Sequence, residues 1–249
     1  MRLSTPAQSS DLHSLARAGN PYHSWLNTLC VGAALAGLAF VIEAAFNFLS
    51  LSARMLGVPG QNMLRAPYPF YLLAVAAMQW IAIWLLTTED PSPLPPRRIR
   101  TWLLRLLATS SLLIVFMYVL RMLEAWRFRT TNVFLALNAI ELFTTILFWT
   151  HLRSVARKLD MHGSRWRALV AMIGTALTLI VLFIGPRSSN EFRIIVASGS
   201  VSLPNARWAS TVLWAVVSAL VMLRFALGFA NEVRQDRKFR AVDRSEQPA

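Results

Sequence analysis

Long apolar blocks without charge are the feature that most constrains how this chain can fold. The blocks 68–88 and 168–186 contain no Asp, Glu, Lys or Arg, and four further apolar blocks of similar length occur along the chain. A helix needs about 20 residues to cross about 30 Å of hydrocarbon. The blocks therefore predict membrane-spanning helices, and a hydrophobic share of 55% agrees with that prediction.

We predict an all-α transmembrane helix bundle of about six spans joined by short connectors. Residues 1–24 would precede this membrane domain of residues 25–230, and residues 231–249 would form a basic, disordered tail. All 12 prolines lie in connectors or at span ends, which supports the boundaries because proline disrupts helix interiors. The predicted spans are 25–49, 68–88, 101–124, 131–152, 168–186 and 208–230.

The distribution of Lys and Arg predicts the orientation of these spans. Roughly twice as many basic residues flank the side that holds both termini, which places the termini in the cytoplasm. Residues 1–24 lack the apolar core of a secretory signal, so the first span is expected to act as its own insertion signal. Arginine greatly outnumbers lysine, a usage that indicates a bacterial source and hence a cytoplasmic (inner) membrane.

The formal charge of +13 raises the question of a polyanionic partner. The basic residues flank apolar blocks and accompany no nucleic-acid-binding motif, so the expected partners are the lipid bilayer and its anionic headgroups, and no nucleic acid. Arg105, Arg157, Lys158 and Arg224 are the candidate headgroup contacts on the cytoplasmic side. Arg105 and Arg224 lie inside their spans, where the alternative is a side chain that reaches back to the interface as an anchor.

Small residues in the first span favour close helix packing. Gly32 and Ala36, like Ala33 and Gly37, are four positions apart and therefore share a helix face. Such a face suits a membrane-protein partner or a second copy of the chain, as well as a neighbouring helix of the same chain.

Glu141 is the main candidate for a functional site. It is the only charged residue between Thr130 and Leu152, and an ionisable side chain in the middle of a span marks a functional site by default. Asn138 and Thr145 share its helix face, and Gln79 and Ser111 lie in neighbouring spans.

Two interpretations of this polar set stand side by side. In the first, Glu141 exchanges a proton or binds a cation in a transport site. In the second, Glu141 is neutral and forms hydrogen bonds that hold helices together, each contributing about 0.6 to 2 kcal/mol. The second is favoured, because suitable partners lie on the same helix face.

Two further features lie toward the outer side of the membrane, opposite the side on which the termini are predicted. Glu43 and Arg121 have matching depths in their spans and are expected to form an ion pair, with an external binding site as the alternative. The connector 190–205 is rich in β-branched residues around Gly199, which predicts a short hairpin.

No motif in the sequence indicates catalysis. Walker A, GxGxxG, HExxH and GxSxG patterns do not occur, and no cofactor or metal is expected. Cys30 is the only cysteine, which excludes a disulfide within the chain. The sequence therefore favours a non-catalytic accessory, scaffold or interaction subunit of the membrane. The alternative is a small-solute or proton-linked transporter that uses Glu141.

Overall fold

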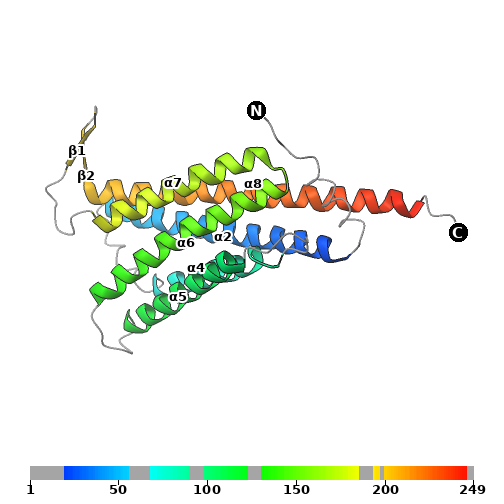
Figure 1. Cartoon of the computed structure of the whole chain (residues 1–249). Coiled ribbons are helices and arrows are strands. Elements are labelled where there is room, and N and C mark those ends of the chain that lie inside the picture. Colours follow the sequence, from blue (N-terminus) through cyan, green and yellow to red (C-terminus); the bar gives the residue numbers. More distant parts are fainter. Residues whose placement is uncertain are drawn as a thin grey trace.

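The computed structural model describes residues 20–55, 68–89, 98–122, 130–184, 193–196 and 199–245. Within these ranges the protein is all-α apart from one hairpin, and six helices pack as a bundle, which confirms the predicted fold class (Figure 1). Each helix overlaps one predicted span. The helices are α2 (Asn20–Met55), α4 (Tyr68–Leu86), α5 (Arg98–Met122), α6 (Thr130–Lys158), α7 (His162–Ile184) and α8 (Leu203–Ser245).

Four of these helices are long and apolar enough to cross a membrane. Many of their large apolar side chains face outward, and Leu38, Leu113 and Leu220 are each more than half exposed. Such a surface suits contact with lipid, so the chain has the composition of a multi-pass membrane protein. For α6 and α7 a full crossing stays a prediction from the sequence. The four qualifying segments are Tyr22–Ser50, Tyr68–Leu86, Ile99–Leu120 and Ala209–Gln235.

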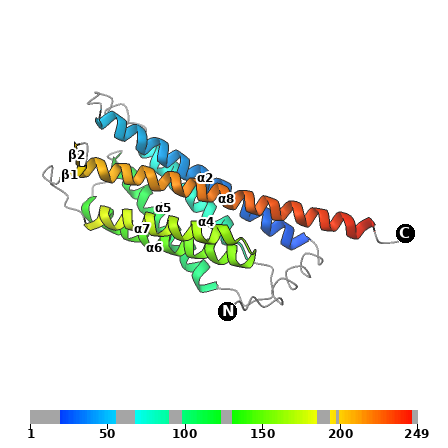
Figure 2. The same ribbon diagram turned by 90° about the horizontal axis from the view of Figure 1, so that it is seen from above.

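The six helices form a closed ring. They alternate in direction, each packs against the next in chain order, and α8 returns to pack along α2 (Figures 1 and 2). The ring has two distinct ends. We call the end that carries the β-strands the hairpin end, and the end at which α6 connects to α7 the turn end.

At the hairpin end, β1 (Arg193–Val196) and β2 (Gly199–Ser202) pair antiparallel. Arg193 lies opposite Ser202, and Val196 lies opposite Gly199. The hairpin predicted for residues 190–205 is therefore confirmed, and its position at the start of α8 follows from the short connection to Leu203.

At the turn end, the chain leaves α6 through a left-handed residue. Asp160 has φ 52°, and the Met161 and Asp160 amides donate to the carbonyls of Ala156 and Arg157 at 2.8 and 3.4 Å. This pattern satisfies the last carbonyls of a helix and reverses the chain. Arg165 of α7 adds a contact to Asp160 at 3.2 Å, so the turn is joined to both helices.

The dry core fills the turn-end half of the ring. Its largest fully buried side chains come from the beginning of α2 and α5, from the later turns of α4 and α6, and from the middle of α8. These positions all lie near the turn end, so packing closes that end of the ring. The residues are Leu26, Leu29, Leu86, Leu104, Trp149, Leu152, Met222, Phe225 and Phe229.

The C-terminal part of α8 extends past the bundle. The sequence predicts a disordered tail from residue 231, whereas the helix continues to Ser245 and stands away from the other helices (Figure 1). The physical reason is composition, because residues 229–245 contain no Gly or Pro to end the helix.

The small residues of α2 are used within the chain. A Cβ added at Gly32 would lie 3.0 Å from both Leu85 Cβ and Leu86 Cγ of α4, whereas one at Gly37 would lie 3.4 Å from Met222 Cβ of α8. Gly32 is thus required for close approach of two helices, and Gly37 has room for a methyl group.

This difference predicts opposite effects of two matched substitutions. Gly32→Ala should lower the free energy of unfolding by about 1 to 3 kcal/mol, because the added methyl overpacks the α2–α4 contact. Gly37→Ala should leave stability unchanged or raise it by up to about 1 kcal/mol through helix propensity. Unfolding titrations of both purified variants in detergent measure this, and equal losses would contradict the assignment of Gly32.

Candidate functional site

A cavity of about 180 Å³ with both polar and apolar walls lies inside the ring and is lined by all six helices. Its volume is enough for several water molecules. Polar side chains are concentrated on its wall, although unsatisfied polar groups are costly inside a membrane protein. They are the carboxyl groups of Glu43 and Glu141, the amide of Gln79, and the hydroxyl groups of Ser111, Thr144, Thr145, Thr175, Thr178, Thr211 and Ser218.

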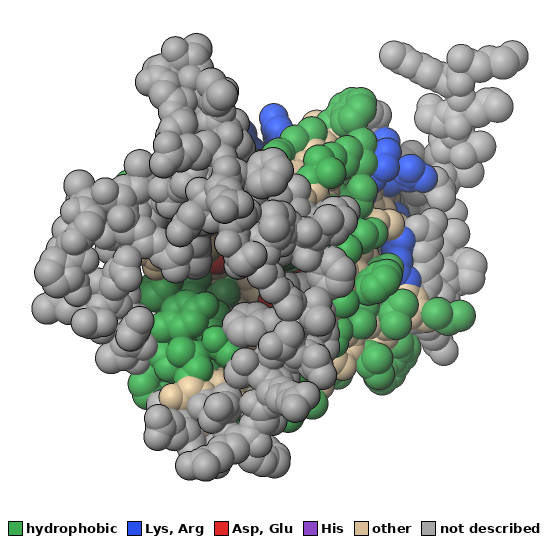
Figure 3. All heavy atoms as spheres, turned by 90° about the vertical axis from the view of Figure 1, so that its left-hand side faces the viewer, with side chains coloured by type: hydrophobic (Ala, Val, Ile, Leu, Met, Phe, Trp, Pro, Cys, Tyr) green, Lys and Arg blue, Asp and Glu red, His purple; other side chains and the backbone are tan. Residues whose placement is uncertain are grey.

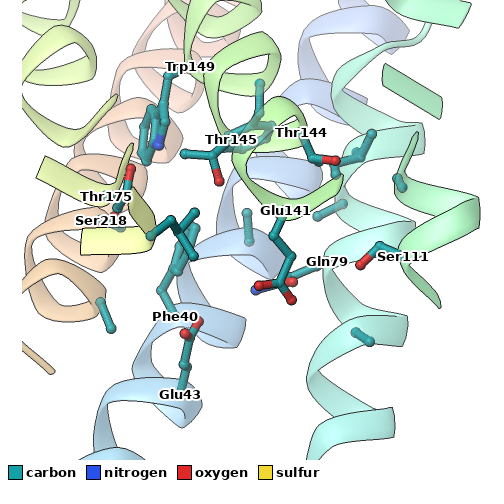
Figure 4. A pocket seen from close by; sticks show the side chains of 18 of the residues that line it. Phe40, Glu43, Gln79, Ser111, Glu141, Thr144, Thr145, Trp149, Thr175 and Ser218 are labelled. Carbon is teal, nitrogen blue, oxygen red and sulfur yellow. The ribbon is translucent and has the colours of Figure 1, made fainter. Parts of the chain in front are cut away.

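The Glu141 carboxyl is directed into the cavity. In Figure 4 it extends from α6 toward Gln79 of α4 and Ser111 of α5. Thr145 lines the same cavity, whereas the side chain of Asn138 lies outside the described residues. No hydrogen bond joins Glu141 to another described residue. The dry, hydrogen-bonded contact that a purely structural role requires is therefore not formed in this part of the chain.

Glu43 brings a second carboxyl to the same cavity. It comes from α2 and lines the same space as Glu141 of α6. The sequence predicts an ion pair between Glu43 and Arg121. The Arg121 side chain lies outside the described residues, so this ion pair stays a prediction. That Glu43 and Glu141 share one cavity was not predicted. The only sequence signal of this shared cavity is that Glu43 and Glu141 are the sole acidic residues of their predicted spans.

Several hydroxyl groups of the wall already donate to their own helix or to a neighbour. Thr144 donates to the Ile140 carbonyl at 2.7 Å, and Thr175 donates to the Ala171 carbonyl at 2.6 Å. The Ser218 hydroxyl is different. It is fully buried at the cavity wall and has no hydrogen-bond partner among the residues that the structure describes. An unsatisfied buried hydroxyl at a cavity calls for a partner in the cavity itself.

Aromatic rings form much of the remaining wall. The indole of Trp80 is oriented by a hydrogen bond from its Nε1 to Thr109 Oγ1 at 3.0 Å. Phe40 stacks with Trp149 at 6.3 Å between ring centroids. Trp214 lies directly on Gly174, where any added Cβ would overlap its ring. Packing therefore holds these rings in place around the polar groups.

The cavity lies near the middle of the ring, on the hairpin-end side of the dry core. Seen from that end, acidic side-chain atoms lie recessed between hydrophobic side chains (Figure 3). The opposite side of the cavity is closed by the dry core of the turn-end half. The two halves of the ring thus differ in polarity as well as in packing.

Arg105 and His151 cap the end of α4 next to that core. The Arg105 guanidinium donates to Thr87 Oγ1 at 2.9 Å and to the Thr87 carbonyl at 2.7 Å, and lies 4.6 Å from the Trp84 ring centroid. His151 Nε2 lies 2.9 Å from the Leu86 carbonyl oxygen, to which it must donate because a carbonyl only accepts. A cation and a donor at a helix C-terminus satisfy its last carbonyls.

The four basic residues predicted to contact headgroups occupy different settings. Arg105 has the partners just described inside the chain. Arg157 and Arg224 are exposed, and Lys158 is half-buried. A contact between any of them and an anionic lipid stays a prediction.

No protein-family model, curated protein or solved structure matches this chain, so function must be argued from the geometry. Within the described ranges, no cluster of three His, Cys, Asp or Glu side chains could hold a metal ion. The chemistry that the cavity offers is that of two carboxyl groups beside neutral hydrogen-bonding groups and aromatic rings.

The capping contacts make Arg105 important for stability. Arg105→Ala should lower the free energy of unfolding by about 1 to 3 kcal/mol, since it leaves the end of α4 without its donors. Arg105→Lys should recover only part of this loss, because an ammonium lacks the fork of a guanidinium. Unfolding titrations test this, with the exposed Arg153→Ala as the control; equal effects at positions 105 and 153 would contradict it.

Substitution of Glu141, unlike that of Arg105, should not lower the stability of the fold. Glu141→Gln and Glu141→Leu should both keep or raise the unfolding temperature, because each removes a carboxyl group that is costly to keep inside the bundle and no described hydrogen bond is lost. Thermal unfolding in detergent measures this, with Arg105→Ala showing that the assay detects a loss. If only the Leu variant loses about 1 to 2 kcal/mol, Glu141 acts as a structural hydrogen-bonding residue.

Proposed function

We propose that this protein is a carrier that moves a small solute across the membrane through its central cavity. The observation that supports the proposal is the cavity itself, which is about 180 Å³ in volume, is enclosed by all six helices and contains two carboxyl groups. Carboxyl groups inside a membrane domain characteristically mark ion or substrate pathways. A purely structural bundle gains nothing from polar groups kept around an open space.

The arrangement of the two halves supports a carrier rather than a channel. The cavity lies on the hairpin-end side of the core, while the turn end is closed by packed side chains of the core. Transport then requires the helices to open this packed layer while the other side closes, as in hinge and shear motions of other proteins. Arg105 joins α5 to the end of α4, so these two helices are expected to move as a pair.

The proposal includes an orientation of the ring in the membrane. Exposed basic side chains gather near the turn end, among them Arg153, Arg157 and Arg167. By the preference of basic residues for the cytoplasmic side, the turn end lies in the cytoplasm of a bacterial cell and both termini lie on that side. The cavity would then face the outside in the described state.

An accessory or interaction subunit is the second candidate. The observation that favours it is the extension of α8, which continues beyond the apolar segment to Ser245 as a charged helix separate from the bundle (Figure 1). A projecting helix of this kind offers a surface to a partner on the cytoplasmic side. This role requires no solute in the cavity.

Thiol labelling distinguishes the two candidates. In a Cys30→Ala background, Ser111→Cys places the only thiol on the cavity wall. A membrane-impermeant thiol reagent should modify it from the outside in right-side-out vesicles. In inverted vesicles the reagent should also modify this thiol from the cytoplasmic side, but more slowly. The reason is that a carrier exposes its site alternately to the two sides of the membrane.

The matched control is Leu113→Cys, two residues further along α5 on the outward apolar face, where the Leu113 side chain is 58% exposed. This position should resist the polar reagent in both kinds of vesicle. Labelling of position 111 from neither side, or from one side alone, would contradict the carrier and leave the interaction subunit as the better explanation.

A further inference from the structure

The charges that line the cavity have one sign. Glu43 and Glu141 are acidic, and the described lining residues include no Lys, Arg or His. The helices α4, α5, α7 and α8 contribute only neutral groups to this wall, and the titratable phenol of Tyr71 on α4 stacks on Phe46, which lies three residues from Glu43 along α2. A site with this charge repels anions and attracts cations.

Size and wall chemistry favour an organic cation over a metal ion. A bare Mg²⁺ or Ca²⁺ is held by about six or more oxygen atoms at roughly 2.0 to 2.6 Å, which requires a small, oxygen-rich site. This cavity has a volume of about 180 Å³, room for several water molecules, and is partly lined by Phe40, Trp80, Trp149 and Trp214. Aromatic faces attract ammonium groups and also contact the carbon atoms that such ions carry.

The polar groups lie on two sides of the space. In Figure 4, Glu141, Gln79 and Ser111 lie on one side, and Thr175 and Ser218 lie across the cavity from them. The buried Ser218 hydroxyl, without a partner in the described part of the chain, is available to a water molecule or to a second polar group of the solute. The site can therefore bind a cationic group at the acidic side and a neutral polar group opposite.

Two neighbouring carboxylates inside a membrane require compensating positive charge. A proton and an organic cation both supply one positive charge, so each can replace the other on the same pair of carboxyl groups. When the cation binds, a carboxyl proton leaves to water; when a proton binds, the cation is released. The charge of the site stays constant through this exchange.

We infer, on the basis of the proposed carrier function, that the cavity binds a small organic cation and exchanges it for protons, with Glu43 and Glu141 as the shared binding groups. The inference gives the carrier a substrate class and a coupling ion. It rests on the two carboxyl groups, the aromatic wall and the volume of the cavity.

Proton movement in liposomes tests the inference. The purified full chain is reconstituted in vesicles that contain a pH-sensitive dye, and the membrane potential is clamped with valinomycin and potassium. Tetramethylammonium chloride is then added outside; this cation has no proton to lose and crosses lipid poorly. Entry of the cation in exchange for internal protons should make the interior more alkaline. Glu43→Gln and Glu141→Gln should each slow this response by about tenfold or more.

The matched control is Asp160→Asn, which removes an acidic charge from the exposed turn between α6 and α7. Asparagine tolerates the left-handed conformation at this position, so the variant should exchange at the rate of the parent. A full rate in the two Gln variants would overturn the role of the carboxyl groups.

The remaining outcomes separate the inference from the proposed function. An equal response to sodium chloride would overturn the organic-cation class, and uptake of labelled tetramethylammonium without proton movement would overturn the exchange. If tetramethylammonium has no effect while Ser111→Cys is labelled from both sides, the carrier stands and this inference fails. If that labelling also fails, both are rejected.

Discussion

The contact between α2 and α8 is the interaction on which the rest of the structure depends. The first and last helices run along each other and close the ring, with Gly37 next to Met222 and the Cys30 thiol 3.5 Å from the Ala226 carbonyl. Lipid offers no hydrogen bonds, so polar side chains must face the inside of such a ring. Without this closure, the wall that holds Glu43 and Glu141 would open to hydrocarbon.

Stability and the candidate site occupy different parts of the ring. The turn-end half contains the dry core, the turn at Asp160 and the capped end of α4, in which Arg105 and His151 satisfy the last carbonyls. The cavity, its two carboxyl groups and a buried hydroxyl without a described partner lie on the hairpin-end side of this core. This division is typical of proteins whose functional groups reduce stability and whose packing elsewhere compensates for it.

Much of the fold could be predicted from the sequence, and the site only in part. The apolar blocks identified all six helices, and the β-branched connector identified the hairpin. Helical periodicity placed Thr145 on the face of Glu141, and depth brought Gln79 and Ser111 near them. That Glu43 lines the same cavity as Glu141 could not be predicted, because depth alone cannot show which helices are neighbours. The internal partner of Arg105 was missed for the same reason, since Thr87 directly follows the end of another helix.

The sequence by itself determined that the chain forms apolar helices of spanning length, roughly where along the chain each of them lies, and which side chains bring charge into them. These properties depend on composition and on spacing along one helix, which are local. Only the tertiary structure decided that the ring closes through α2 and α8, that both carboxyl groups share one cavity, and that the Arg105 side chain caps α4. Those outcomes depend on contacts between helices far apart in the chain, and such contacts are set by the packing of whole helix faces rather than by any local pattern.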